Sequence, residues 1–150
     1  MKLILIRHGE SAKNVGLDVL GEDNNLTLKG VHQAIAVGKK LVEQKIDTIY
    51  CSPSERCVQT MDEILRLRED NFPIHLTKLV GPKTSLELYE KMKARVELFL
   101  DDLKYEHQEN ETVVVISHQL VLAMMILQLT GETRRMENGE MEEIEITLSS

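Results

Sequence analysis

The largely apolar run Lys2-Leu3-Ile4-Leu5-Ile6 is followed at once by the polar sequence Arg7-His8-Gly9-Glu10-Ser11. A short, continuous apolar run of this kind is typical of a buried strand in a parallel sheet. A second such run, Thr112-Val113-Val114-Val115-Ile116-Ser117, comes directly before His118. Because open α/β sheets bind their ligands beyond the carboxyl ends of the central strands, we expect both histidines at one crevice.

Strand-like and helix-like segments alternate along the rest of the chain. Two shorter strands are expected at residues 46–51 and 74–79, and an alternating edge strand at 142–148. Helices are expected between the strands at about residues 28–44, 54–69, 84–104 and 118–130. Thr27 is expected to be the N-cap of the first helix. This alternation predicts a three-layer α/β/α sandwich with a mostly parallel central sheet. With no repeat, linker or low-complexity tract, residues 1–150 are expected to form a single domain.

The last segment of the chain is strongly acidic. The run from Glu137 to Glu145 is expected to be a solvated edge of the sheet, reached through a hairpin turn at Asn138-Gly139. The edge strand near the C-terminus would follow that turn.

Composition and charge narrow the possible functions. The chain has 150 residues, of which 42% are hydrophobic and 29% charged, as expected for a globular domain. No apolar run is long enough to cross a membrane, and the first is too short for a signal peptide. The two cysteines are too few for a secreted disulfide scaffold, so we expect a cytoplasmic protein. A net charge of -7 argues against a nucleic-acid partner but allows a small phosphorylated substrate.

The residues after the first strand suit an anion. A charged pair directly after an apolar run is costly unless a partner satisfies it, and a phosphoryl group would do so. The planar guanidinium of Arg7 matches phosphate oxygens, and the neutral imidazole of His8 is a nucleophile near physiological pH. Gly9 would let the backbone approach the anion closely.

Four segments, in order along nearly the whole chain, resemble the histidine phosphatase superfamily, which contains the cofactor-dependent phosphoglycerate mutases. Ile6-Arg7-His8-Gly9-Glu10-Ser11 with Asn14 is similar to the opening motif of the family. Three later segments match as well: Leu26-Thr27-Leu28-Lys29-Gly30 followed by Gln33-Ala34, Ser52-Pro53-Ser54-Glu55-Arg56-Cys57-Val58-Gln59-Thr60, and Val113 to His118.

The resemblance implies specific roles in a phosphatase that uses no metal ion or other cofactor. His8 would be the nucleophile that becomes phosphorylated, inside a cationic ring of Arg7, Arg56 and His118. Further substrate contacts would come from Gly9, Ser11, Asn14 and the backbone N–H of Gln119. Two arginines and a second imidazole can stabilise the charge of phosphoryl transfer without a metal.

Two departures from the family pattern bear on the substrate. Phosphoglycerate mutases carry a glutamate that protonates the leaving oxygen, but no carboxylate lies here from His75 to Leu86. Without that acid we expect substrates whose leaving group is easily expelled, such as a phosphohistidine protein or a small aryl phosphate. The proton could also come from a residue elsewhere, with four carboxylates as open candidates: Asp18, Glu22, Asp23 and Glu87. The second departure is Gln119, where the family has glycine.

Other functions remain as alternatives or are disfavoured. A mutase-type phosphotransfer enzyme and a non-catalytic phosphate- or protein-binding module on the same fold both stay open. Cys51 and Arg56 resemble a cysteine-phosphatase signature, but only four residues separate them, where that signature needs five. Cys51 is instead expected to be a buried thiol at the end of a strand. Zinc ligation is disfavoured because the histidines and cysteines lack ligand spacing.

Overall fold

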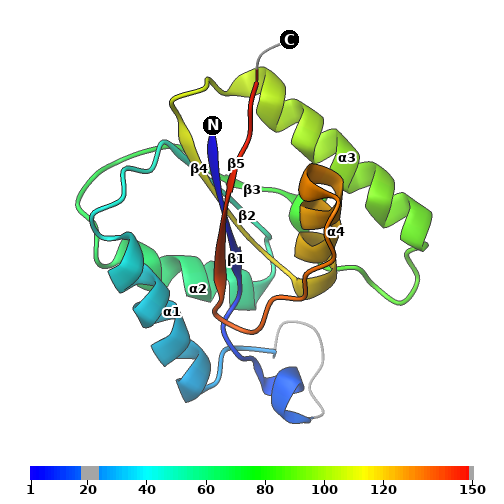
Figure 1. Ribbon diagram of the computed structural model, residues 1–150. Helices are drawn as coiled ribbons and strands as arrows, with labels where there is room; N and C mark the ends of the chain where they lie inside the picture. Colours follow the sequence, from blue (N-terminus) through cyan, green and yellow to red (C-terminus); the bar gives the residue numbers. More distant parts are fainter. Residues whose placement is uncertain (18–23, 149–150) are drawn as a thin grey trace.

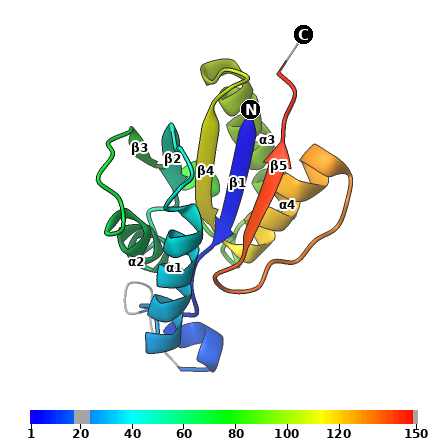
Figure 2. The same cartoon turned by 60° about the vertical axis from the view of Figure 1, so that its left-hand side comes forward.

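A mixed five-stranded sheet forms the centre of the protein in the computed structural model, which describes residues 1–17 and 24–148. The strands lie in the order β3-β2-β4-β1-β5, which can be followed across Figure 2. Their bounds are β1 (Lys2–Arg7), β2 (Thr48–Cys51), β3 (Ile74–Leu76), β4 (Thr112–Ser117) and β5 (Met141–Glu145).

Parallel pairing brings the ends of the two most apolar strands together. β1 pairs with β4 in parallel, so that Arg7 lies opposite Ser117. β4 also pairs in parallel with β2, where Cys51 lies opposite Ile116. Only β5 is antiparallel, at the edge beside β1. The sheet is therefore mostly parallel, and the polar residues that follow β1, β2 and β4 meet at its carboxyl edge.

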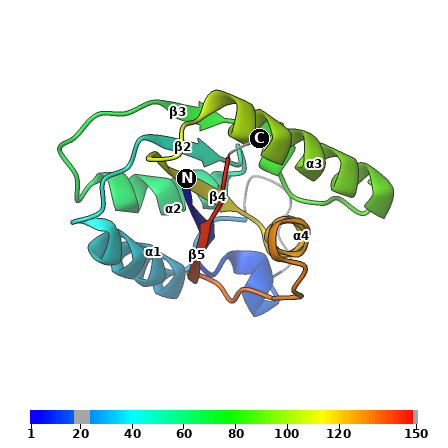
Figure 3. The ribbon, with the colours of Figure 1, turned by 45° about the horizontal axis from the view of Figure 1, so that its top comes forward.

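Four α-helices cover the two faces of the sheet. α1 (Leu28–Leu41) and α2 (Glu55–Leu65) pack on one face, and α3 (Tyr89–Glu106) and α4 (Gln119–Thr130) on the other (Figures 1 and 3). Each face of the sheet has its own hydrophobic core, and alternate residues of β1 point into one or the other. Ile4 packs with α1 and α2, whereas Leu5 packs with α3 and α4. The predicted three-layer α/β/α sandwich is confirmed. Within the described part of the chain, no helix has both the length and the apolar character needed to span a bilayer.

Some predicted boundaries were wrong because local hydrogen bonds compete with the regular elements. The helix expected from residue 84 begins at Tyr89, after a turn in which the Glu87 N–H donates to the Thr84 carbonyl. The strand expected at 74–79 ends at Leu76, because the Thr77 hydroxyl accepts the Leu79 N–H and begins a short 3₁₀ helix, η3 (Lys78–Val80). A hydroxyl or carboxamide near its own backbone often ends an element in this way.

The other helices are shorter than their apolar patterns suggested. α1 ends at Leu41 rather than 44, and α2 at Leu65 rather than 69. α4 begins at Gln119, with His118 as its N-cap. The last strand covers Met141–Glu145 rather than 142–148.

The turn at Asn138-Gly139 is present, but it is not a hairpin. Gly139 has a φ of 72°, the left-handed conformation that glycine adopts without strain. The strand that follows pairs with β1, far away in sequence, instead of with a strand just before the turn. The alternating acidic sequence identified the edge strand correctly, while the choice of partner depended on the apolar surface of β1.

The loop after β1 is held by close packing of two glycines. A Cβ added to Gly30 would lie 2.1 Å from the Glu10 carbonyl oxygen, and one on Gly9 would lie 2.4 Å from the Gly30 carbonyl oxygen. The Glu10 N–H also donates to Gln33 Oε1 at 2.8 Å. The first turns of α1 therefore press against the segment that carries His8.

We predict that Gly30→Ala destabilises the protein by about 1–3 kcal/mol, because the added methyl would overlap backbone atoms that cannot move independently. The control is Gly38→Ala in the same helix, where the nearest atom to an added Cβ is the flexible Leu67 Cδ1, at 3.0 Å. Urea denaturation measures both free energies of unfolding. Equal stability of the two variants would contradict the close contact between α1 and the loop.

Candidate active site

The carboxyl ends of β1 and β4 bring two buried imidazoles together. The backbone N–H of His8 donates to the Ser117 carbonyl at 3.2 Å, which links the ends of the two strands. The rings of His8 and His118 lie 5.3 Å apart between centroids, with an interplanar angle of 64°. Both residues are buried, with 4% and 6% of their surface exposed. The pair predicted from sequence thus lies at one crevice.

A pocket of about 240 Å³ opens over this pair. Of the lining residues that the structure describes, four are Lys or Arg and none is Asp or Glu. The lining consists of Arg7, His8, Ser11, Lys13, Asn14, Asn24, Arg56, Pro82, Lys83, His118, Gln119 and Leu120. In a protein with a net charge of -7, this local excess of positive charge favours an anion.

The hydrogen bond of His8 determines which of its nitrogens can react. Nδ1 lies 2.7 Å from the Gly9 carbonyl oxygen, which can only accept a hydrogen bond. Nδ1 therefore carries the proton, and the lone pair of Nε2 is free to attack an electrophile.

His118 is oriented from both sides of its ring. Arg56 Nη2 donates to Nδ1 at 3.2 Å, so the proton of the neutral ring is on Nε2, which lies 2.8 Å from Ser52 Oγ. Arg56 comes from the first turn of α2, and Ser52 from the loop that follows β2. This contact brings Arg56 beside the two imidazoles, where a cation can bind the same anion that they contact.

Burial and positive neighbours keep both histidines neutral. Desolvation, opposed by the hydrogen bond to Gly9 but helped by Arg56 and Arg7, lowers the pKa of His8 to about 4. Desolvation together with Arg56 and His8 lowers the pKa of His118 to about 2. At neutral pH the pocket therefore holds two uncharged imidazoles among permanently charged guanidinium groups.

Arg7 is held in place yet keeps one donor unused. Its side chain is buried, and Nη1 donates to the Met136 carbonyl at 3.0 Å. Nε is buried without a hydrogen-bond partner. Arg7 also lines the pocket, so the rest of its guanidinium is placed to meet an anion there.

Asn14 and Ser11 act as a unit at the edge of the pocket. Asn14 Oδ1 accepts hydrogen bonds from the N–H of Ser11, from the Ser11 hydroxyl and from Asn138 Nδ2. Its own amide Nδ2 is then the end that can donate to a ligand. Ser11 lines the pocket, but its hydroxyl hydrogen is directed to Asn14, so its main contribution is to orient that side chain.

The N-terminus of α4 supplies backbone donors at the same edge. The first N–H groups of a helix have no partner within it, and the helix dipole favours an anion there. Gln119 is the first residue of α4 and lines the pocket. Its Nε2 donates to the Met136 carbonyl at 3.4 Å, which draws the amide towards the same oxygen that binds Arg7.

The predicted contact of Gly9 with the substrate stays a prediction, and the structure gives Gly9 a different role. Gly9 is absent from the described lining, and its N–H donates to Thr60 Oγ1 at 3.1 Å. The Thr60 hydroxyl in turn donates to the Arg56 carbonyl at 2.8 Å. Glycine is required here by close packing on Gly30, and Thr60 links the His8 loop to the helix that carries Arg56.

Several supporting residues were not singled out from the sequence. Ser52 and Thr60 lie inside the motif around Arg56, and their hydrogen bonds give these two positions a structural reason. Asn138 Nδ2 also donates to the His8 carbonyl at 3.3 Å, and the Gly139 N–H approaches the same carbonyl. Lys13 and Lys83 line the pocket but carried no recognisable signal, because an isolated lysine in a loop is ordinary.

Of the four candidate proton donors, the structure describes only Glu87. Glu87 is held by Arg95, whose Nε and Nη2 donate to its two oxygens at 2.7 and 2.9 Å, and this pairing lowers the pKa of Glu87. Glu87 is thus kept ionised outside the described lining of the pocket, which disfavours it among the four open candidates. Asp18, Glu22 and Asp23 lie outside the described residues.

Cys51 has no access to this chemistry. Its side chain is fully buried, its thiol donates to the Ser52 carbonyl at 3.3 Å, and desolvation raises its pKa further. This confirms the interpretation of Cys51 as a buried thiol at the end of a strand, since a nucleophilic cysteine needs a lowered pKa.

Comparisons with known proteins agree with this geometry. The sequence profile of the histidine phosphatase superfamily (branch 1) matches residues 3–80 and 76–148. The chain is 28% identical to phosphoserine phosphatase 1 of Hydrogenobacter thermophilus, over 87% of this chain and 77% of that protein. A longer protein of Schizosaccharomyces pombe is 24% identical over 87% of this chain but only 57% of its own length.

A solved structure gives the same result for the fold. The α-ribazole phosphatase of Shigella flexneri superposes with a TM-score of 0.82 at 25% identity, covering 98% of this chain and 91% of that one. The profile match covers almost the whole sequence, and both histidines of the crevice fall within it. The chain belongs to the histidine phosphatase superfamily.

Proposed function

We propose that this protein is a metal-independent phosphatase that hydrolyses phosphate compounds through a phosphohistidine intermediate on His8. One observation carries the proposal: His8 presents an unprotonated Nε2 inside a pocket whose described charged residues are all cationic. Catalysis of phosphoryl transfer consists mainly of positioning and charge stabilisation, and this pocket is built for both.

The reaction would proceed in two balanced steps. The Nε2 lone pair of His8 attacks phosphorus, a P–N bond forms, and the P–O or P–N bond to the leaving group breaks with its electron pair. A water molecule then attacks the phosphorus, the P–N bond to His8 breaks, and the lone pair returns to Nε2. The proton lost by the water leaves with the phosphate or with solvent, and the products are inorganic phosphate and the free leaving group.

Positive charge would stabilise both transition states. The guanidinium groups of Arg7 and Arg56, which both line the pocket, can donate to the equatorial oxygens of the transferring phosphoryl group. The dianion would also make protonation of His118 easier, since an opposite charge raises the pKa of an imidazole. Protonated Nδ1 would no longer accept a hydrogen bond from Arg56, and its N–H would become available to the phosphoryl group.

The lining of the pocket favours substrates with a good leaving group. No Asp or Glu among the described lining residues can protonate the leaving atom, and a positioned acid contributes about 10²–10⁴-fold in rate. A phosphohistidine protein or a small aryl phosphate needs this help least.

We also propose a cytoplasmic location. The buried thiols of Cys51 and Cys57, which form no disulfide, are consistent with it.

We predict that His8→Ala abolishes hydrolysis of p-nitrophenyl phosphate above background, because the attacking atom is lost. Arg56→Ala should retain some activity, with kcat lowered about 10²–10³-fold by the loss of one charged donor. His32→Ala, an exposed position on α1, is the control and should match the wild type. Steady-state kinetics in the presence of EDTA test all three variants.

Two results would count against this account. If His8→Ala hydrolyses the ester as fast as the wild type, His8 is not the nucleophile. If the wild type binds phosphate but turns over neither p-nitrophenyl phosphate nor a phosphohistidine protein, the chain is a binding module on the same fold.

We predict that His8 stays neutral far below the ordinary histidine pKa of 6.5 and gains its proton only near pH 4. Burial disfavours the charged ring, so the neutral nucleophile should persist throughout the physiological range. An NMR titration of the imidazole nitrogens measures this directly, with the urea-unfolded chain as control. Added inorganic phosphate should raise the midpoint, whereas a midpoint near 6.5 in the free protein would contradict the buried, cationic environment.

A further inference from the structure

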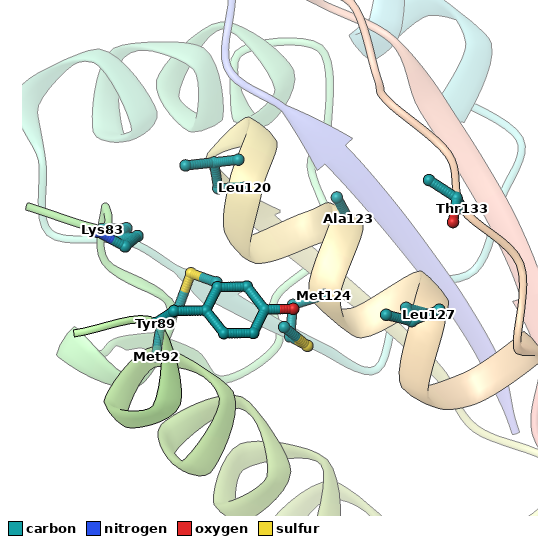
Figure 4. A pocket seen from close by; sticks show the side chains of 8 residues that line it. All are labelled: Lys83, Tyr89, Met92, Leu120, Ala123, Met124, Leu127 and Thr133. Carbon is teal, nitrogen blue, oxygen red and sulfur yellow. The ribbon is translucent and has the colours of Figure 1, made fainter. Parts of the chain in front are cut away.

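A second cavity lies between α3 and α4, beside the catalytic pocket. It has a volume of about 390 Å³ and is lined by Lys83, Tyr89, Met92, Leu120, Ala123, Met124, Leu127 and Thr133. Figure 4 shows Leu120, Ala123, Met124 and Leu127 along one helix, with Tyr89 and Met92 facing them from the other. A groove of this size could hold a small organic molecule.

The groove is continuous with the catalytic pocket. Lys83 and Leu120 line both cavities, so the two share a wall where α4 begins. In Figure 4 these two residues lie towards one end of the groove, and Leu127 and Thr133 towards the other. A substrate with its phosphoryl group at His8 would therefore reach this groove with the part that leaves.

The lining is suited to an apolar group. Six of the eight lining residues have apolar or aromatic side chains, and Lys83 is the single charged one. The Lys83 ammonium donates to the Thr84 carbonyl at 3.2 Å, near the junction of the two cavities. The polar groups of the described lining are the Lys83 ammonium and the hydroxyls of Tyr89 and Thr133, so most of a leaving group in the groove would meet apolar atoms. The flexible thioethers of Met92 and Met124 could adjust to rings of different shape.

The surface around the groove is also unusually apolar. Leu120 is 55% exposed and Tyr89 is 53% exposed, while Leu86 and Leu88 just before α3 are 93% and 68% exposed. Exposed apolar side chains beside a groove on a globular protein commonly mark a binding site. Its position beside the catalytic pocket, instead of elsewhere on the molecule, ties it to the substrate.

We propose that the groove between α3 and α4 binds the leaving group of the substrate, and that this leaving group is aromatic and larger than a single ring. The assignment rests on the proposed phosphatase function and narrows it. Two observations lead to one substrate class: the groove accommodates an apolar body, and the cationic described lining of the catalytic pocket suits an oxygen that leaves as a stable anion. An aryl phosphate satisfies both conditions.

The test compares 2-naphthyl phosphate with phenyl phosphate, because the two phenols are similar leaving groups and differ mainly in apolar size. Wild type should prefer the naphthyl ester at least about tenfold in kcat/KM, since apolar contacts in a pocket discriminate by this order. Ala123→Phe fills the middle of the groove, and Leu127→Glu places a charge at its far end. Both variants should lower the ratio towards one while hydrolysing phenyl phosphate with the kcat of the wild type.

Leu98→Glu is the matched control. Leu98 lies on α3 and is 53% exposed, comparable to Leu120, but it lines neither cavity. This variant should keep the preference of the wild type, and circular dichroism establishes that all three variants are folded.

The outcomes separate the inference from the function on which it depends. Turnover of both esters by the wild type with a ratio near one overturns the leaving-group site and leaves the phosphatase intact. So does a preference that survives both groove substitutions. An apolar surface that serves a phosphoprotein instead would give that same ratio near one with small esters. No turnover of either ester by the wild type overturns both proposals.

Discussion

The parallel pairing of β1 with β4 is the constraint on which the rest of the site depends. Its register places Arg7 opposite Ser117, so the residues that follow, His8 and His118, leave the sheet side by side. A shift of one residue would turn every side chain of β1 to the other face and separate the imidazoles. The hydrogen bonds of the parallel ladder, and the bond from the His8 backbone N–H to the Ser117 carbonyl at 3.2 Å, hold this register at the polar ends of the strands.

The pocket also depends on segments from three other parts of the chain. Thr60 joins α2 to the loop after β1, and the packing of Gly9 on Gly30 joins α1 to the same loop. On the opposite side, the Met136 carbonyl holds Arg7, and Asn138 contacts the His8 backbone. Each catalytic candidate is thereby positioned by a hydrogen bond or close contact outside its own strand. The cationic groups remain close to one another without an anion because these contacts oppose their repulsion.

The parts of this arrangement that could be predicted are those with a local signature. The runs 2–6 and 112–117 identified the central strands, and the residues that follow them identified His8 and His118. Helix ends could not be placed, because capping by Thr77 and the turn at Thr84 depend on single hydrogen bonds. The groove between α3 and α4 could likewise not be predicted from the sequence. It arises from the packing of two helices, and each of their apolar residues alone resembles ordinary core.

Electrostatics and shape lead to one account of the chemistry. Burial keeps His8 unprotonated, so the nucleophile exists in its reactive form where a free imidazole would be partly charged. Arg7 and Arg56 line the same pocket as His8, so their positive charge is in place for an arriving phosphoryl group. The groove nearby suits an apolar body, with Lys83 as a cation where the two cavities meet. Charge recognition and leaving-group recognition are thus divided between two adjoining cavities.

The central claim is that the phosphoryl group passes through His8 before it reaches water. The most direct test follows the stereochemistry at phosphorus, using an aryl phosphorothioate made chiral with oxygen isotopes and hydrolysed in isotopically labelled water. Each in-line displacement inverts the configuration, so two successive displacements predict overall retention. Net inversion would show that water attacks the substrate directly, and would contradict a covalent phosphohistidine intermediate.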